Sequence, residues 1–263
     1  LCVYTNNPFA GAMRGFGVPQ AAFAHESQMD LLAEALHMDP LEIRRVNALK
    51  TGSRTATRQT LQESVGIGQC LDAVGPHYEK AMKDWVHGET DLSKQRGVGV
   101  GAMWYGIGNT GVQNPSTAHM EMDTEGRITL YTGCADIGQG STTVLSQIAA
   151  QVLGISPEDL QTVVGDTART SNAGATSASR QTYISGNAVR DAAEKLAEVL
   201  LTEGVDLLKK PKADLVLAGG YVAEQRNPKH RVSFSKIAAR ATKRGIPLRW
   251  QGYFDPPTVP LDP

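Results

Sequence analysis

The spacing of apolar residues predicts helices in the first third of the chain. One helix begins after Gly17, and its apolar residues recur on one face: Met29, Leu32, Ala33 and Leu36. A second helix begins after Asp39, a good N-cap residue that is followed by proline and, three residues on, by Glu42. A third helix is predicted for residues 69–86, after a polar, turn-rich stretch that we expect to cross the surface.

From residue 97 the apolar pattern changes to that of strands. Residues 97–108 are apolar and rich in glycine, which we interpret as a strand. Residues 118–123 and 127–133 each alternate between apolar and polar side chains, and the short turn between them predicts a β-hairpin. A helix follows, with an apolar stripe made of Val144, Leu145, Ile148 and Val152.

The remainder of the chain mixes both kinds of element. A buried strand is predicted at residues 160–164 and a long helix at residues 187–201. Two short strands are expected around Leu215 and Tyr221, then a helix over residues 233–243 and a polar exit that ends in proline. Because helices, strands and hairpins are interspersed, the pattern favours α+β lobes over a doubly wound parallel sheet.

Length and composition indicate a soluble globular protein. The chain has 263 residues, of which 41% are hydrophobic and 20% charged, so it can bury a sizeable core. It is long enough for one large domain or for two lobes, with residues 1–95 and 96–263 as the candidate sub-lobes. It starts at Leu1, without methionine and inside a strand-like run, and we interpret it as a fragment of something longer.

Charge and cysteine usage exclude several classes of protein. The formal net charge of −1 gives no support to a nucleic-acid partner. From Val205 onward eleven Lys or Arg face five Asp or Glu, an excess of +6 that we interpret as a solvated face or a contact with a missing partner. No signal peptide and no apolar run near about 18 residues is present, so we expect no membrane span. The three cysteines form no C-x-x-C motif, which predicts neither a zinc nor an iron-sulfur site here and favours reduced thiols in the cytoplasm.

Three loops combine small residues with the start of a helix. The first, residues 11–17 (GAMRGFG), has glycines that allow a close ligand approach, an arginine that supplies charge or braces the loop, and a phenylalanine between glycines. The second, residues 138–143 (GQGSTT), offers backbone N–H groups, an amide and hydroxyls to a phosphate, or is simply a helix cap braced by Asp136. The third, residues 171–182 (SNAGATSASRQT), is a ligand loop or a mobile surface loop.

The three loops together resemble a known family. The stretches GAMRGFGVPQ, MEMDTEGRITLYTGCADIGQGSTTVLSQIAAQVLGI and GDTARTSNAGATSASRQTYISGNAV are similar to the molybdopterin-binding portion of the xanthine dehydrogenase and aldehyde oxidoreductase family, the molybdenum hydroxylases. The similarity runs in order over nearly the whole chain and is weakest at residues 51–95 and beyond about residue 205. It implies an α+β fold of mixed-sheet two-layer lobes of the molybdenum cofactor-binding type, with this chain as most of the second lobe.

The resemblance also implies roles for individual residues. Arg14 would lie beside the molybdenum, and Phe16 would orient the substrate ring. Ala178 and Ser179 would line the substrate pocket together with these two residues. The residues implied to bind the cofactor are Ala12, Met13, Arg14, Gly138, Gln139, Gly140, Ser141, Thr142, Ser179, Arg180 and Gln181.

One expected residue is missing from the sequence. Members of the family use a glutamate in a G-x-G-E type stretch as the base that activates the attacking oxygen, and no such stretch occurs in residues 1–263. We therefore expect no catalytic residue and no protein ligand to the metal in this chain, and no turnover of substrate by the chain alone. The first loop reads MRGFG where the carbon monoxide dehydrogenase branch carries a cysteine, which argues against that branch.

The implied parent enzyme would insert a water-derived oxygen into a purine, an N-heteroaromatic compound or an aldehyde. Its cofactor would be molybdenum with molybdopterin, with the cytosine dinucleotide form as one alternative. Iron-sulfur clusters and a flavin (FAD) would belong to other domains or subunits, and the partners would be these, the remainder of the molybdenum subunit and a small-molecule substrate, in an oligomer. Three alternatives stay open: a non-catalytic module for a phosphorylated ligand, a scaffolding lobe, and a 4-hydroxybenzoyl-CoA-reductase-like enzyme.

Overall fold

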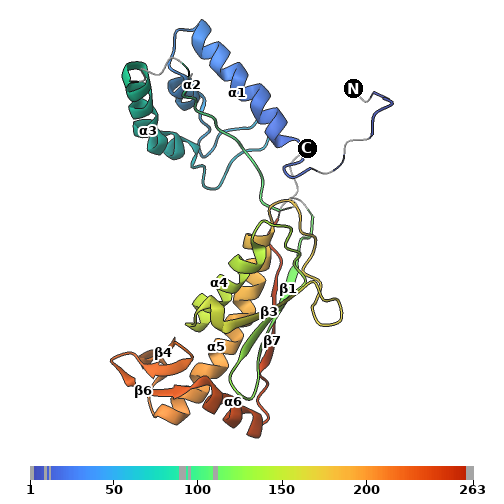
Figure 1. The fold of residues 1–263 in the computed structure, drawn as a ribbon, viewed down its shortest axis with the longest axis vertical. Coiled ribbons are helices and arrows are strands. Elements are labelled where there is room, and N and C mark those ends of the chain that lie inside the picture. The colour runs from blue at the N-terminus through green and yellow to red at the C-terminus, as the bar shows by residue number, and fades with distance from the viewer. Residues whose placement is uncertain are drawn as a thin grey trace. The chain divides into compact units, whose positions relative to one another are not determined.

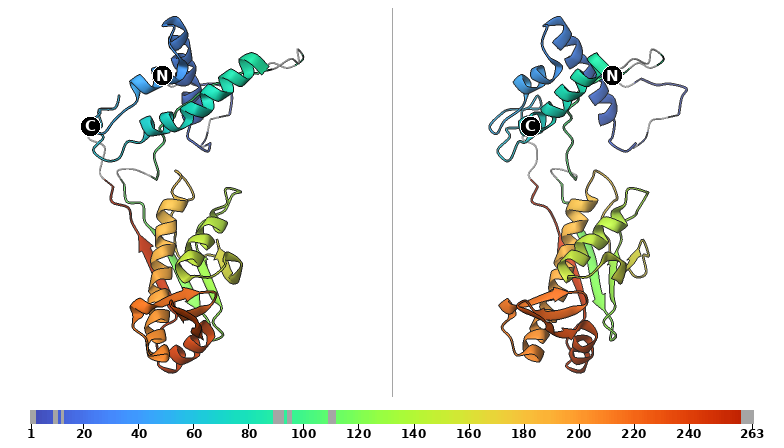
Figure 2. Two further views of the ribbon diagram at one scale, coloured as in Figure 1. Left: turned by 90° about the vertical axis from the view of Figure 1, so that its left-hand side faces the viewer. Right: turned by 60° about the vertical axis from the view of Figure 1, so that its left-hand side comes forward.

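The chain folds as two compact units. The computed structural model describes residues 3–8, 11, 13–88, 93, 96–108 and 112–258 (Figure 1). The first unit comprises Leu1–Tyr105 with Leu261–Pro263, and the second comprises Gly106–Pro260. Figure 2 shows the helical first unit and the mixed second unit from two further sides. The sequence predicts a boundary near residue 95, whereas the contacts divide the chain between residues 105 and 106.

The described part of the first unit contains three helices, α1 (Val18–Ala35), α2 (Pro40–Asn47) and α3 (Ile67–Gly88), and each was predicted from the sequence. The Asp39 carboxylate caps α2, accepting hydrogen bonds from the backbone nitrogens of Leu41 (2.8 Å) and Glu42 (3.1 Å). The predicted apolar face of α1 is largely uncovered, because Ala33 is its one buried residue and Leu32 and Leu36 are exposed.

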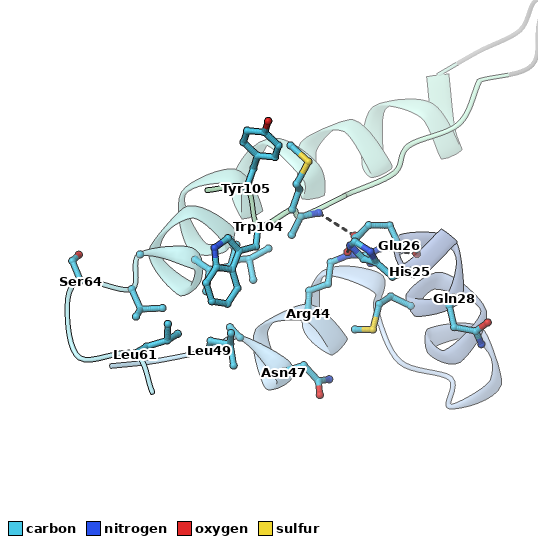
Figure 3. A pocket seen from close by; sticks show the side chains of 18 residues that line it. His25, Glu26, Gln28, Arg44, Asn47, Leu49, Leu61, Ser64, Trp104 and Tyr105 are labelled. Carbon is cyan, nitrogen blue, oxygen red and sulfur yellow. Dashed lines mark hydrogen bonds and ion pairs between the residues drawn. The ribbon is translucent and has the colours of Figure 1, made fainter. Parts of the chain in front are cut away.

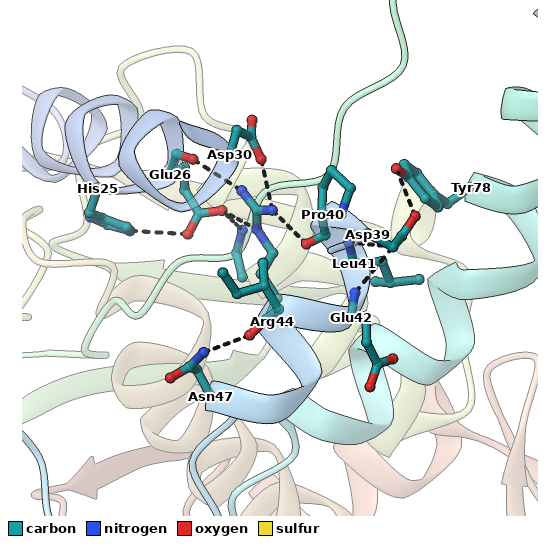
Figure 4. A network of polar contacts seen from close by, with 12 residues as sticks. His25, Glu26, Asp30, Asp39, Pro40, Leu41, Glu42, Arg44, Asn47 and Tyr78 are labelled. Carbon is teal, nitrogen blue, oxygen red and sulfur yellow. Dashed lines mark hydrogen bonds and ion pairs between the residues drawn. The ribbon is translucent and has the colours of Figure 1, made fainter. Parts of the chain in front are cut away.

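An ion-pair network centred on the buried Arg44 side chain holds α1 and α2 together (Figure 4). The guanidinium of Arg44, on α2, donates to the Glu26 carboxylate at 2.7 Å and pairs with Asp30 at 2.9 Å, both on α1. Glu26 also accepts a hydrogen bond from the backbone nitrogen of Ala102 at 3.0 Å. The network therefore ties the segment after α3 to the first two helices.

The second unit is built on a four-stranded sheet with the order β3-β2-β1-β7. The predicted hairpin is β1 (Ser116–Met122) with β2 (Ile128–Thr132), and the outer strands are β3 (Leu160–Val164) and β7 (Arg249–Phe254). Only the β2–β3 pair is parallel. In both central strands alternate side chains are buried, which fixes one face of the sheet as the core face.

Two helices cover that face, α4 (Ser141–Leu153) and α5 (Gly186–Leu208), and both confirm the sequence prediction (Figure 1). Their fully buried leucines pack with strand residues in one core: Met120, Leu130, Leu145, Leu153, Leu196 and Leu200. The helix α5 runs seven residues past the predicted end because it continues to a second, smaller sheet.

That smaller sheet is antiparallel, with the order β4-β5-β6, and packs with α6 (Phe234–Lys243) against the end of α5. Its strands are β4 (Leu215–Ala218), β5 (Tyr221–Glu224) and β6 (Asn227–Ser233). Part of the positive charge after Val205 is neutralised here, because Arg240 on α6 and Arg244, the residue that caps its C-terminus, both donate to the buried Glu203 carboxylate, at 2.7 and 2.6 Å.

Three sequence predictions about strands are wrong, and two strands of the structure were missed. Residues 97–108 form no strand, because Val98 and Val100 pack against α3 instead of pairing with a neighbouring strand. The strand β3 is an edge strand, and of its residues only Leu160 is buried. The strands β6 and β7 were not predicted at all. Residues 3–5 have no strand either, and Leu1 and Cys2 lie outside the described residues.

The missed strand β7 has no local signal because a distant contact determines it. It pairs with β1, and Gly252 lies against α5 so closely that a Cβ atom there would come within 2.0 Å of the Ala188 carbonyl oxygen.

Within the described residues, no helix combines the length and the apolar character needed to cross a bilayer. The predicted α+β class with mixed-sheet lobes is confirmed.

Candidate functional site

The second loop is held in shape by Asp136. Its carboxylate accepts hydrogen bonds from the backbone nitrogens of Gly138 (2.9 Å), Gly140 (3.3 Å) and Thr142 (3.0 Å), the last in the first turn of α4. The bonds from Thr142 and Gly138 lower the pKa of Asp136 below its ordinary value. Asp136 therefore braces this loop, and the start of α4 already carries a negative charge from its own chain.

The Gln139 side chain turns back into the same loop. Its amide oxygen accepts from the Ile137 backbone nitrogen at 2.6 Å, and its amide nitrogen donates to the Ala135 carbonyl (3.1 Å) and to the Ser141 hydroxyl (3.0 Å). Gly138 and Gly140 both have positive φ, and no heavy atom lies within 4 Å of where a Cβ atom would stand. The loop thus leaves open space beside its glycines while its polar side chains are bonded internally.

The third loop is joined to the second through Thr176. The Thr176 hydroxyl accepts from the Ala135 backbone nitrogen (3.0 Å) and from the Gln181 amide (2.7 Å), and donates to the Ala135 carbonyl (3.2 Å). A hydroxyl has one proton and two lone pairs, so this group is fully used. We call the meeting of the two loops, defined by Ala135, Thr176 and Gln181, the loop junction.

Beside the loop junction the backbone is strained. Ala178 and Ser179 both have left-handed φ, 50° and 58°, which costs a non-glycine residue roughly 1–2 kcal/mol. The Ala178 carbonyl accepts from the Gly108 backbone nitrogen at 2.7 Å, and a π-helical turn (η2, Gln181–Ser185) leads from there into α5. Strained residues and π-helical turns are frequent at ligand sites.

Arg180 lies entirely inside the protein. Its guanidinium donates only to backbone carbonyls, and neither its side chain nor its backbone has exposed surface. Of the described residues, four have a buried side-chain polar atom with no hydrogen-bond partner, and three of these atoms cluster here: Asn114 Nδ2, Arg180 Nε and Gln181 Oε1. The cluster marks this region as one where a bound group could complete the hydrogen bonding.

Sequence reasoning did not single out Asn114 or Thr176. Asn114 precedes β1 in an Asn-Pro pair, a turn signal without chemical content, and its role depends on Arg180, which is distant in sequence. Thr176 stands in a loop with Thr170, Ser177 and Thr182, and no local pattern distinguishes it from them. Both residues belong to the site only through the fold.

The first loop belongs to the first unit and is described by itself. Gly15, Phe16 and Gly17 are consecutive residues with positive φ, of 98°, 50° and 85°. The backbone nitrogen of Phe16 donates to the Met13 carbonyl at 2.8 Å, and the Phe16 side chain is 66% exposed. The tight turn therefore presents an aromatic ring outward at the start of α1. Ala12, also predicted to bind the cofactor, lies outside the described residues.

A pocket of about 810 Å³ also lies in the first unit, and none of the predicted site residues lines it (Figure 3). Its wall is mostly apolar and includes Trp104, Leu49 and Leu61, with Arg44 and Glu26 at one side. Among the described residues, no group of three or more His, Cys, Asp or Glu side chains is placed to hold a metal ion.

Comparison with known proteins identifies the family. The sequence profile of the molybdopterin cofactor-binding domain matches residues 69–262, and a second profile of the same description matches residues 1–48. The chain is similar to the aldehyde oxidoreductase of Megalodesulfovibrio gigas, with 34% identity over 229 residues, which are 84% of this chain and 25% of that protein. It is also similar to the xanthine dehydrogenase molybdenum-binding subunit of Escherichia coli O157:H7, with 35% identity over 236 residues, 86% of this chain and 30% of that subunit.

A solved structure agrees with these matches. The aldehyde oxidoreductase from Desulfovibrio desulfuricans superposes with a TM-score of 0.71 at 30% identity, covering 95% of this chain and 25% of that one. The chain spans 25–30% of the length of these relatives. The longer profile match covers well over half of the chain. The chain therefore belongs to the molybdopterin cofactor-binding domain family of the molybdenum hydroxylases.

Proposed function

We propose that this chain is the cofactor-holding part of an enzyme that inserts a water-derived oxygen into an electron-poor C–H bond. The observation that carries the proposal is the loop junction, where Thr176 joins the two loops of the second unit that are predicted to hold the cofactor. Helix starts and glycine-rich loops are common, but two of them bonded to each other beside strained backbone and unpartnered polar atoms form a built site.

The residues at the loop junction fit an anionic cofactor rich in hydrogen-bonding groups, such as molybdopterin. The space beside Gly138 and Gly140 allows a phosphate to approach the backbone. The unpartnered Asn114 Nδ2 and Gln181 Oε1 atoms offer a donor and an acceptor, and Ser179 adds an exposed residue with a hydroxyl group. These are the complementary groups that a pterin ring and its phosphate require.

Individual roles follow from this fit. Gly138, Gln139 and Gly140 would hold the phosphate or its nucleotide extension, with the Ser141 and Thr142 hydroxyls beside them. Because Asp136 already accepts the backbone N–H groups of Gly138, Gly140 and Thr142, the part of the two glycines would be to give the phosphate room beside the loop. The polar contacts would come from side chains, and the Gln139 amide would exchange an internal bond for one to the ligand.

The third loop would line the pterin and the substrate pocket through Ala178, Ser179 and Gln181. The chemistry that the bound cofactor supplies is a two-electron oxidation at the substrate carbon. The residues of this chain bind and orient, and the base that removes a proton would come from another part of the same subunit.

The first loop, taken by itself, is the part of the chain that we propose for contacts with the metal and the substrate. Arg14 offers a positive charge, with Ala12 and Met13 beside it, and Phe16 offers a ring face to a flat substrate. We therefore propose a purine, an N-heteroaromatic compound or an aromatic aldehyde as the substrate class. The names of the two curated relatives, a xanthine dehydrogenase subunit and an aldehyde oxidoreductase, support the same range.

The finer assignments rest on the family resemblance. We propose the cytosine dinucleotide form as one alternative for the cofactor, and iron-sulfur clusters and a flavin in other domains or subunits. We further propose that the parent enzyme is an oligomer in the cytoplasm, where Cys70 and Cys134, which form no disulfide, stay reduced.

The decisive experiment measures molybdenum and released-pterin fluorescence on the complete parent assembly, purified from its native host. Near-stoichiometric metal and pterin would support the proposal and would exclude a metal-free phosphate-binding module or a scaffolding lobe. A folded assembly with neither signal, from a host with verified metal and pterin supply, would overturn it. Reductive turnover of an aromatic acyl-CoA instead of oxidation would favour the 4-hydroxybenzoyl-CoA-reductase-like alternative.

A further inference from the structure

Arg180 forms the centre of the third loop. One terminal nitrogen donates to the carbonyls of Ala173 (2.5 Å) and Ala175 (3.1 Å), and the other donates to those of Asn114 (3.2 Å) and Pro115 (2.6 Å). The guanidinium therefore ties the third loop to the entrance of β1, and its fork geometry suits four acceptors on two segments.

The loop is shaped to admit this group. Gly174 lies so close to the guanidinium that a Cβ atom at this position would come within 2.6 Å of a terminal nitrogen, and its φ is +74°. Any side chain at position 174 would displace Arg180. The loop therefore wraps around the guanidinium and has no independent shape.

The positive charge of Arg180 has no carboxylate partner within the described part of the chain. Burial lowers the pKa of its guanidinium, but an arginine stays protonated in a protein. Arg44 is the natural comparison, because its side chain is equally buried but paired with Glu26 and Asp30. A buried charge without a counterion is costly and is retained where something else compensates it.

The carbonyl groups that accept hydrogen bonds from Arg180 determine the direction in which the backbone N–H groups of the same peptide units point. A trans peptide unit directs its C=O and the next N–H in opposite directions. With the Ala173 and Ala175 carbonyls turned inward, the N–H groups of Gly174 and Thr176 point away from the guanidinium. The Gly174 N–H donates to Asn172 Oδ1 at 2.8 Å, so the Thr176 N–H is the donor that this arrangement turns outward. A loop with these two acceptors hidden, a donor outward and a positive charge beneath it favours an anion.

We propose that Arg180 is a positioning residue for an anionic group of the cofactor, acting from beneath the loop without touching the ligand; this rests on the proposed function. Its guanidinium occupies the carbonyl oxygens of Ala173 and Ala175 in the third loop, and the bound anion compensates its positive charge. Its own Nε and two neighbouring atoms, Asn114 Nδ2 and Gln181 Oε1, are buried without a hydrogen-bond partner in the same region. A merely structural arginine would affect stability alone.

The test uses the complete molybdenum subunit in its assembly, produced in a host that supplies the cofactor. The variants are R180M, which removes the charge, and R180K, which keeps the charge but cannot span four carbonyls. R44M and R44K are the matched controls, since Arg44 is equally buried but lies in the first unit. Three quantities are measured: molybdenum and pterin per folded subunit, the half-time of pterin release, and the Tm of the cofactor-free protein.

We expect R180M to hold about tenfold less cofactor than wild type, equivalent to roughly 1.4 kcal/mol, and R180K to fall between the two and to release pterin faster than wild type. The R44 variants should lower Tm without changing cofactor content.

Equal cofactor content in wild type and R180K would overturn the argument that the guanidinium geometry matters. If R180M does not fold, the comparison of R180K with wild type decides whether the proposal holds. Cofactor loss in proportion to Tm across all four variants also overturns the proposal. Wild-type protein without cofactor would instead overturn the proposed function.

Discussion

The Thr176 hydroxyl lies 3.0 Å from the Ala135 backbone nitrogen and 3.2 Å from its carbonyl oxygen, and so joins two loops that are 41 residues apart in sequence. Each loop alone is an ordinary loop that leads into a helix. Their union, with the Gln181 amide as a third partner at 2.7 Å, turns the start of α4 and the approach to α5 into one surface.

This union predicts the effect of removing one hydroxyl. In T176V a methyl group replaces the hydroxyl, so the Ala135 N–H and the Gln181 amide both lose their partner. We expect a loss of about 1 kcal/mol in the free energy of unfolding, at the low end for an unsatisfied group because water reaches the site in part. T176S keeps the hydroxyl and should retain most of the stability. Urea unfolding of both variants measures this, and equal midpoints for T176V and T176S would contradict the role of the bond.

Asp136 predicts a pH-dependent contribution from the second loop. Its carboxylate accepts three backbone N–H groups, which lower its pKa in the folded protein. A lowered acid pKa stabilises the fold above the unfolded value of about 3.9, and this contribution is lost as the pH falls through the folded pKa. The D136N variant should therefore be less stable than wild type at pH 7, and the difference should shrink toward pH 3. A difference that stays constant with pH would show that shape, and not charge, braces the loop.

His119, on the open face of the sheet, predicts a further loss of stability on acidification, at a higher pH than the loss from Asp136. Burial and the nearby Arg249 charge lower its pKa, while Gln251 and Glu121 act weakly in the other direction. The unfolded chain takes up a proton below about pH 6.5 and the folded protein resists it, so stability falls as the pH drops from 6.5 toward the folded pKa. Urea midpoints between pH 7.5 and 5 should fall more for wild type than for H119Q. Parallel curves for the two proteins would remove His119 as the cause.

The elements that the sequence predicts best are those set by local periodicity. The capped helix after Asp39 and the β1–β2 hairpin follow from residues that are close together in the chain. The strand β7 fails this rule, because its register is set by β1 and by the close approach of Gly252 to α5. The strand predicted for residues 97–108 does not form, although the local pattern favours one. Its valines at alternate positions, Val98 and Val100, pack on a helix and not in a sheet.

The candidate site likewise has features that the local sequence predicts and features that only the fold determines. The three loops can be found from composition, because small residues before a helix indicate a close approach of the backbone to something else. The bond between Thr176 and Ala135 cannot, since it depends on how β3, the strand between the two loops, pairs with β2. The burial of Arg180 is likewise invisible in sequence, where an arginine in a polar loop is expected at the surface.

Phe16 predicts how the first loop affects substrate choice. Its ring is 66% exposed on a turn of three left-handed residues, so it contributes little to the core of its own unit. In the complete enzyme F16A should weaken the binding of planar aromatic substrates by about 0.5–1.5 kcal/mol, the usual range for an aromatic contact, and leave small aliphatic aldehydes nearly unaffected. The control is F23A, which removes another exposed ring, 78% accessible, from the adjacent helix α1. Dissociation constants for one aromatic and one aliphatic substrate measure the effect. An equal loss in F23A, or a loss confined to the aliphatic substrate, would show that Phe16 does not contact the substrate ring, because stacking acts only between flat partners.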